Sequence, residues 1–274
     1  MGRMMLEYDG LLVDEVGPWA KEKHERLRKY VDISRATRRK WIERSNPATY
    51  IDLFCGAGRS IIRETREIID GSPLVAFKCA QEGGVPFSEI HIADAAEEKC
   101  RAAERRIVRA GGTAQMEFGD AEDTAVRIAK KLNPYGLHLA FLDPYNLEAL
   151  PFSVFEVLAK FKYIDLLVHI SVHDLQRNLD AYSMSVDGPL DQFAPGWRTA
   201  VSLKQSKPAT RAAYVAYWAS KMEALEFPPA RYELVSGTTK NQRLYWLVLV
   251  SHHKKAKEFW DKIRNISGQG EFSL

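Results

Sequence analysis

The chain has 274 residues, 46% of them hydrophobic and 27% charged, which is ordinary for a globular protein. No apolar run approaches the roughly 18 residues of a membrane helix, and the start lacks the apolar core of a signal peptide. We therefore expect a cytoplasmic protein without membrane contact. Three widely spaced cysteines argue against a disulfide framework or a metal cluster. The formal net charge of +3 is too small to indicate nucleic-acid binding by the chain as a whole.

Patterning along the chain predicts a strand–helix alternation after an N-terminal part. Residues 1–18 are expected to form an irregular arm, followed by helices over 19–30 and 34–44. Strands are expected at 48–54, 89–93, 114–118, 137–142 and 165–171. Helical patterns lie between them, at 95–109, 124–132 and 152–160. This alternation, with acidic residues at strand ends, is typical of a doubly wound parallel sheet.

The C-terminal third departs from this alternation. Turn signals in a polar stretch predict an insertion at about 174–210, near the carboxyl edge of the sheet. A helix at 209–224, strands at 232–236 and 244–251, and a helix at 254–266 follow. The two strands are expected to close the sheet as an antiparallel pair. We predict an N-terminal arm and basic helices over 1–47 and an α/β domain over 48–274.

Basic residues are concentrated between Lys21 and Arg44. This segment contains ten basic and four acidic residues, with aromatic residues between them. A positive surface with aromatic rings suits phosphate contact and base stacking. The candidate nucleic-acid contacts here are Arg38, Arg39 and Lys40. A solvated amphipathic helix that docks its aromatic residues on the main domain explains the same pattern.

The most informative stretch joins the first strand to a glycine loop. It reads Tyr50-Ile51-Asp52-Leu53-Phe54-Cys55-Gly56-Ala57-Gly58-Arg59. A side chain at Gly56 or Gly58 would lie where a nucleoside-like cofactor must approach the backbone. Alone, this pattern is a weak signal.

Acidic residues also follow the later strands, at Asp94, Asp120 and Asp143. Ligands of an open parallel sheet bind at the carboxyl ends of its strands, so we expect these residues to converge. An acid at the second strand end can accept both ribose hydroxyls, and one at the third can accept from an adenine amine. Capping of the following helix is an alternative role for Asp94, and a place in a turn for Asp120.

Together these motifs resemble the class I S-adenosylmethionine-dependent methyltransferases. The segment Leu142-Asp143-Pro144-Tyr145 resembles the Asp/Asn-Pro-Pro-Tyr/Phe motif of amino-methylating nucleic-acid enzymes. More narrowly, the glycine stretch, Gly71-Ser72-Pro73-Leu74 and Phe141-Leu142-Asp143-Pro144-Tyr145 resemble the three-Cys-motif partner protein family. Members of that family are methyltransferase-like and are encoded beside a radical-SAM-like protein with three cysteines. The resemblance covers roughly residues 17–250.

The resemblance implies a Rossmann-like methyltransferase sheet with S-adenosylmethionine as cofactor. In the catalytic motif Asp143-Pro144-Tyr145, Asp143 would orient the target amine and Tyr145 would stack on an extruded base. The implied cofactor contacts are Asp52, Phe54, Gly56 and Gly58 at the methionine end, Asp94 at the ribose and Asp120 at the adenine. The implied partners are a nucleic acid or nucleotide, or a protein of the three-Cys-motif radical-SAM-like type.

This chain departs from the pattern in three places. The motif lacks its second proline, Asn146 occupies a position without a fixed polar group, and 42 residues separate Asp52 from Asp94. Dinucleotide folds place ~20 residues between the glycine loop and the ribose acid. We explain the long interval by an extra charged loop over 59–70 that overhangs the site. In it, Arg59 and Arg63 are candidate phosphate contacts.

Two other functions remain open at this point. A partner or binding module would keep the fold but dock a neighbouring protein or nucleic acid without methyl transfer, and the shortened motif favours it. A nicotinamide-dependent dehydrogenase is weaker, because Ile61 stands where a dinucleotide loop has its third glycine. The sequence identifies neither the acceptor nor the oligomeric state.

Overall fold

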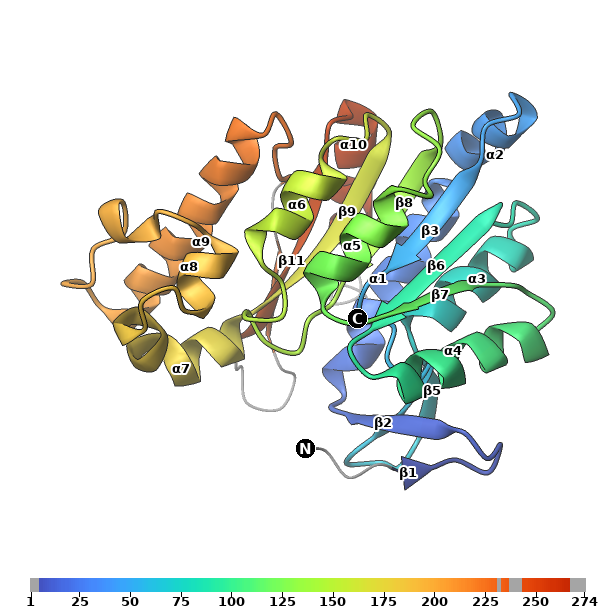
Figure 1. Cartoon of the computed structure of the whole chain (residues 1–274), viewed down its shortest axis with the longest axis horizontal. Coiled ribbons are helices and arrows are strands. Elements are labelled where there is room, and N and C mark those ends of the chain that lie inside the picture. Colours follow the sequence, from blue (N-terminus) through green and yellow to red (C-terminus); the bar gives the residue numbers. More distant parts are fainter. Residues whose placement is uncertain (1–4, 231–232, 237–242, 267–274) are drawn as a thin grey trace, which may run out of the picture.

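The computed structural model describes residues 5–230, 233–236 and 243–266. Within these residues seven strands form one sheet in the order β10-β11-β9-β8-β3-β6-β7 (Figure 1). Their bounds are β3 Ala48–Asp52, β6 Glu89–Asp94, β7 Gln115–Phe118, β8 Leu137–Leu142, β9 Ile164–Ser171, β10 Glu233–Ser236 and β11 Arg243–Ser251. The predicted strand start at Tyr232 and the turn over 237–240 lie outside the described residues.

The pairing of the strands confirms the predicted fold class. β3, β6, β7, β8 and β9 are parallel, whereas β11 runs antiparallel between β9 and β10. Counted in chain order, the sheet reads 3-2-1-4-5-7-6. Dinucleotide-binding sheets read 3-2-1-4-5-6, so the inserted antiparallel strand also argues against the dehydrogenase alternative.

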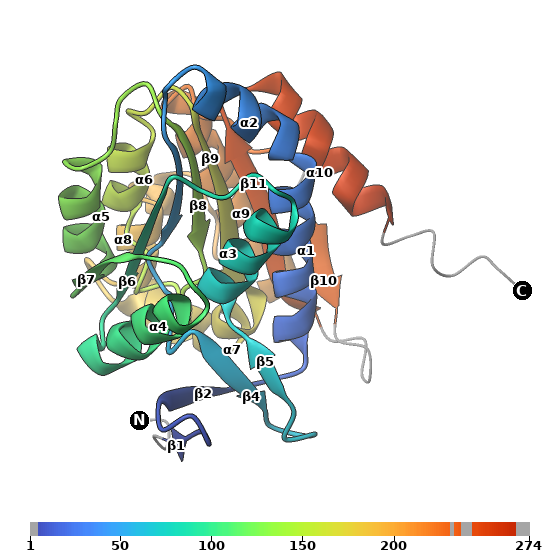
Figure 2. The same ribbon diagram turned by 90° about the vertical axis from the view of Figure 1, so that its right-hand side faces the viewer.

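Helices cover both faces of the sheet (Figure 2). On one face lie α1 Trp19–Ile33, α3 Ser72–Glu82, α4 Glu97–Arg109 and α10 Lys254–Ile266; on the other lie α5 Ala121–Ala129, α6 Phe152–Leu158, α7 Val172–Met184 and α9 Lys207–Ala224. In β8, Leu139 and Phe141 pack on the first face, and Ala140 and Leu142 on the second. A strand buried on both sides is therefore apolar at successive positions, which made β8 predictable.

The N-terminal arm and the segment over 59–70 are not irregular, contrary to prediction. β1 Met5–Leu6, β2 Leu12–Val16, β4 Arg59–Ile62 and β5 Ile68–Asp70 form a second sheet in the order β1-β2-β4-β5. β2 pairs in parallel with β4, and Asp14 lies opposite Ser60. Strands this short give weak periodicity, and the partner of β2 lies far away in sequence. Local sequence patterns therefore predicted neither the N-terminal strands nor the strands over 59–70.

The segment predicted as an insertion, at about 174–210, consists largely of helices. α7 begins directly after β9, and α8 Pro189–Phe193 and the short helix Trp197–Thr199 follow. Phe193 and Trp197 pack on Tyr214 and Trp218 of α9, which explains the order of this polar stretch. The helix α2 Arg35–Glu43 continues α1 at the amino edge of the sheet. None of the described helices has the length and apolar character needed to cross a membrane.

Candidate functional site

A cavity of about 670 Å³ opens at the carboxyl ends of the parallel strands. We call it the acidic cavity. Its lining includes Leu53, Phe54, Asp94, Gly119, Asp120, Glu122, Tyr145, Glu148, Phe152 and Glu156. The structure thus brings together four of the predicted site residues: Phe54, Asp94, Asp120 and Tyr145.

The charge of this lining restricts what it can hold. Five carboxylates face the cavity, and the described lining contains no lysine or arginine. Such a lining favours a positively charged ligand and repels phosphate. A dinucleotide, whose pyrophosphate carries negative charge, fits this cavity poorly.

Asp94 connects the cavity to the glycine loop. Its Oδ2 accepts a hydrogen bond from the Gly56 amide at 3.0 Å, and its Oδ1 accepts from the Ala96 amide at 2.9 Å. Burial raises the pKa of the Asp94 carboxyl, and these two amides oppose that rise. The carboxylate keeps acceptor capacity on the cavity side, as contact with two hydroxyls requires.

Asp120 and Tyr145 are exposed at the same cavity. Asp120 directly precedes α5, but its side chain makes no capping hydrogen bond. Tyr145 is 82% exposed. Asn146 has a local role, because its Oδ1 accepts from the Ala149 amide at 3.0 Å and so holds the turn after the motif.

Asp52 lies behind the cavity and not in its lining. It is fully buried and accepts hydrogen bonds from the Tyr50 hydroxyl at 2.9 Å and the Phe54 amide at 3.2 Å. Burial raises the pKa of Asp52 to about 7. The structure shows a group that organises the strand end. Its predicted contact with the methionine end stays a prediction.

The structure gives a reason of its own for the two glycines of the loop. Gly56 and Gly58 both have φ in the left-handed region, at +55° and +79°. A Cβ on Gly58 would lie 2.9 Å from Ala103 Cα in α4, and one on Gly56 would lie 2.6 Å from Asp14 Oδ2. Positive φ and close packing of the chain on itself therefore both require glycine at these positions, and the predicted cofactor contact of the loop stays a prediction.

Asp14 of the small sheet closes over this loop. Its Oδ2 accepts from the Ala57 amide at 2.8 Å, and its Oδ1 lies 2.6 Å from Lys99 Nζ. A carboxylate from the N-terminal sheet thus contacts the loop backbone beside Gly56. Sequence reasoning missed Asp14, because nothing in its surroundings marks it as a loop contact.

Asp143 lies in a buried cluster with two groups that the sequence did not connect to it. The Lys23 ammonium of α1 contacts both of its oxygens, at 2.7 and 2.6 Å, and His169 Nδ1 lies 3.1 Å from Oδ1. Burial alone raises the pKa of Asp143, but Lys23 and then His169 outweigh it, and the net pKa lies below the ordinary value. Burial, then Lys23, lowers the pKa of His169 to about 4, so this imidazole is neutral.

One signal for Lys23 was present in the sequence. Ala20, Leu27 and Tyr30 form the buried stripe of α1, and Lys23 occupies the same stripe. A lysine on the apolar face of a helix requires a buried partner. Its partner is 120 residues away in sequence, so the pattern alone did not name it.

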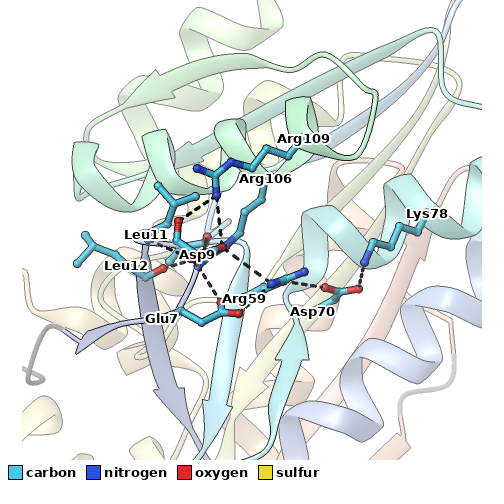
Figure 3. Close-up of polar contacts among 10 residues, drawn as sticks. Glu7, Asp9, Leu11, Leu12, Arg59, Asp70, Lys78, Arg106 and Arg109 are labelled. Carbon is cyan, nitrogen blue, oxygen red and sulfur yellow. Dashed lines mark hydrogen bonds and ion pairs between the residues drawn. The ribbon is translucent and has the colours of Figure 1, made fainter.

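The basic candidates do not gather at the acidic cavity. Arg59 is bound internally, with Nη1 2.9 Å from Glu7 Oε1 and Nε 3.4 Å from Asp70 Oδ1 (Figure 3). In the same cluster Arg106 is buried between Glu7 and Asp9, which fastens β1 and β2 to α4 (Figure 3). The predicted overhanging loop is therefore part of a sheet, and Arg59 is committed to that sheet.

The other basic candidates also lie away from the cavity. Arg38 is buried and donates to Val85 O at 2.7 Å and Val31 O at 2.9 Å, so backbone carbonyls hold its guanidinium away from the acidic cavity. Arg63 is exposed and lies 3.6 Å from Glu15. Arg39 and Lys40 are exposed on α2, at the amino edge of the sheet.

No protein-family model matches the chain, and no curated protein matches it significantly. Among solved structures, the chain is similar to protein LPL1258 of the DUF519 family from Legionella pneumophila, with a TM-score of 0.54 and 10% sequence identity. The similarity covers 88% of this chain and 90% of that chain. This likeness supports the fold alone.

Two looser likenesses were also found. The bifunctional kinase-methyltransferase WbdD has a TM-score of 0.45 and 12% identity, with 88% of this chain and 44% of that chain covered. M. jannaschii TYW2 in complex with AdoMet has a TM-score of 0.41 and 10% identity, with 90% of this chain and 83% of that chain covered. Likeness this loose supports no statement about cofactor or substrate. The strand order and pairing define a doubly wound α/β protein with one antiparallel strand inserted next to the edge of its sheet.

Proposed function

We propose that the chain is an S-adenosylmethionine-dependent methyltransferase acting on an amine of a nucleic acid or nucleotide. The observation that carries the proposal is the acidic cavity, where Asp94, Asp120 and Tyr145 from successive strand ends meet. Strand order and strand-end acids together support a nucleoside cofactor at this edge.

The residues present fit this cofactor. S-adenosylmethionine supplies an electrophilic methyl group on a positively charged sulfur, and the carboxylate lining suits that charge. Asp94 would accept from the ribose hydroxyls and Asp120 from the adenine amine, while Leu53 and Phe54 offer apolar contact. The absence of lysine and arginine from the described lining supports a cofactor without phosphate.

The acceptor end depends on Asp143 and its partners. Asp143 accepts the Lys23 ammonium in the way that it would accept a target amine. An acceptor amine must therefore share or replace this contact. The neutral imidazole of His169 lies beside the same carboxylate, with its Nδ1 3.1 Å from Asp143 Oδ1. Positioning is the main requirement for in-line transfer, and Tyr145 would supply it by stacking on the base.

A methyl-transfer assay tests the proposal. Labelled S-adenosylmethionine is incubated with the chain and pooled DNA, tRNA and rRNA, and the product nucleosides are identified by mass spectrometry. We expect label in one class. Asp143→Asn should abolish transfer and keep cofactor affinity, whereas Asp180→Asn, the same change at an exposed acid on α7, should have no effect.

The Lys23–Asp143 ion pair favours a second candidate. If this pair is permanent, the chain is a partner module that docks a three-Cys-motif radical-SAM-like protein or a nucleic acid without methyl transfer. Wild-type chain that binds the cofactor but labels no acceptor class would support the module and contradict the methyltransferase.

A further inference from the structure

At the opposite, amino edge of the sheet, α2 lies near α10 (Figure 2). A second cavity lies there, lined by residues of α2 and of the starts of β8 and α10. Its volume is about 210 Å³. We call it the edge cavity, and its lining includes Thr37, Lys40, Trp41, Tyr163, Asp165, His253 and Lys255. β8 has six residues, which at about 3.3 Å per residue place the two cavities roughly 17 Å apart. The edge cavity is distinct from the acidic cavity.

Aromatic rings form one wall of the edge cavity. Trp41 and Tyr163 meet edge to face, with centroids 5.2 Å apart, and His253 stacks on Tyr163 at 5.5 Å with an interplanar angle of 7°. Phe87 and Phe259 also line the cavity. Such rings provide faces on which a planar heterocycle can stack.

Polar atoms in the lining have no hydrogen-bond partner among the described residues. They are Thr37 Oγ1, His138 Nδ1 and His253 Nε2, all buried. An unpaired buried polar atom costs about 1–3 kcal/mol, so a ligand that pairs with these atoms gains affinity. Asp165 accepts from the Tyr30 hydroxyl at 2.8 Å and also from the Ser251 side chain, and a carboxylate can accept more than two hydrogen bonds. The ligand should therefore be planar and carry both donors and acceptors, as a nucleobase does.

Positive charge surrounds the opening. Lys40 and Lys255 are exposed and line the cavity, and Lys162 Nζ lies 5.4 Å from the Tyr163 ring centroid. Exposed ammonium groups suit phosphate. We propose that the edge cavity binds a nucleotide, its base against Trp41 and Tyr163 and its phosphate at Lys40 and Lys255. The nucleotide is either free or an unstacked member of a single strand, and the proposal does not depend on methyl transfer.

Calorimetric titration of the full chain tests this site. One arm uses AMP and the other a short single-stranded oligonucleotide, and saturable binding in either arm identifies the source. Trp41→Leu should weaken binding about tenfold, because stacking on an aromatic ring contributes about 1–3 kcal/mol per base. Thr37→Val is nearly isosteric and should weaken binding severalfold. This second variant keeps the test valid where Trp41→Leu fails to fold.

Matched charge variants separate the cavity from general electrostatics. Lys40→Gln/Lys255→Gln should weaken binding strongly. Arg39→Gln/Lys254→Gln removes the same charge from the same helices, at residues outside the lining, and should have little effect. Asp94→Asn, which alters the acidic cavity, should leave this binding intact. Absence of saturable binding by both probes at millimolar concentration, equal losses in the two double variants, or unchanged binding in Trp41→Leu and Thr37→Val would overturn the proposal.

Discussion

The pair between Lys23 and Asp143 should contribute measurably to the stability of the fold. The exposed fractions of the two side chains are 9% and 16%, so water screens the pair weakly. Lys23→Met removes the ammonium and leaves the Asp143 carboxylate without the lysine that contacts both of its oxygens. Breaking a buried pair in this way costs about 3–5 kcal/mol, an expected fall in melting temperature of roughly 6–15 °C.

Urea unfolding at pH 7 measures this loss, and a double-mutant cycle isolates the pair. Asp143→Asn combined with Lys23→Met removes both charges, so the double variant should recover most of the loss. Lys21→Met is the control. Lys21 lies on the same helix as Lys23 and pairs with Glu67, which lies between β4 and β5, and both side chains are about half exposed. The change in unfolding free energy should be within about 1 kcal/mol. If Lys23→Met and Lys21→Met cost the same, the reasoning about burial is wrong.

Three further predictions follow from single residues. Asp52 has a folded pKa of about 7 against an ordinary 3.8, so its contribution to stability falls as pH rises from about 4 to about 7. The unfolding free energy of Asp52→Asn relative to that of the wild type should therefore rise across that window, by at most about 4 kcal/mol. Urea unfolding at several pH values measures it, and a difference that does not change with pH would contradict this prediction. Gly58→Ala should lower the unfolding free energy by about 1–3 kcal/mol more than Gly10→Ala does. Both glycines have positive φ, but only Gly58 lies against Ala103. Equal unfolding free energies of the two variants would refute the packing argument. If methyl transfer is observed, Tyr145→Ala should lower kcat/KM for the acceptor about tenfold without changing cofactor affinity, and unchanged kinetics would exclude stacking.

The convergence of the site was predictable because one rule of topology governs it. Asp94 ends β6, and Asp120 and Tyr145 come shortly after β7 and β8. The carboxyl ends of parallel strands share one edge of the sheet, so no knowledge of side-chain packing was needed. The strands β8 and β9 were equally predictable from their continuous apolar runs, since both faces of these strands are covered.

The missed features depend on contacts between distant parts of the chain. β2 is a strand because β4 lies beside it, and Gly56 is close to Asp14 for the same reason. Lys23 reaches Asp143 only after α1 packs on the sheet. Such contacts join short or single elements, for which local periodicity carries little information.

The most direct test of the account is calorimetric titration of the chain with S-adenosylmethionine. We predict saturable binding that Asp94→Asn weakens about tenfold or more, because Asp94 is the carboxylate that would accept from the ribose. Glu97→Gln, a change to a nearby acid outside the cavity lining, should leave the affinity unchanged. No detectable binding by the wild type at millimolar concentration, or equal affinity in wild type and Asp94→Asn, would contradict the assignment of the acidic cavity.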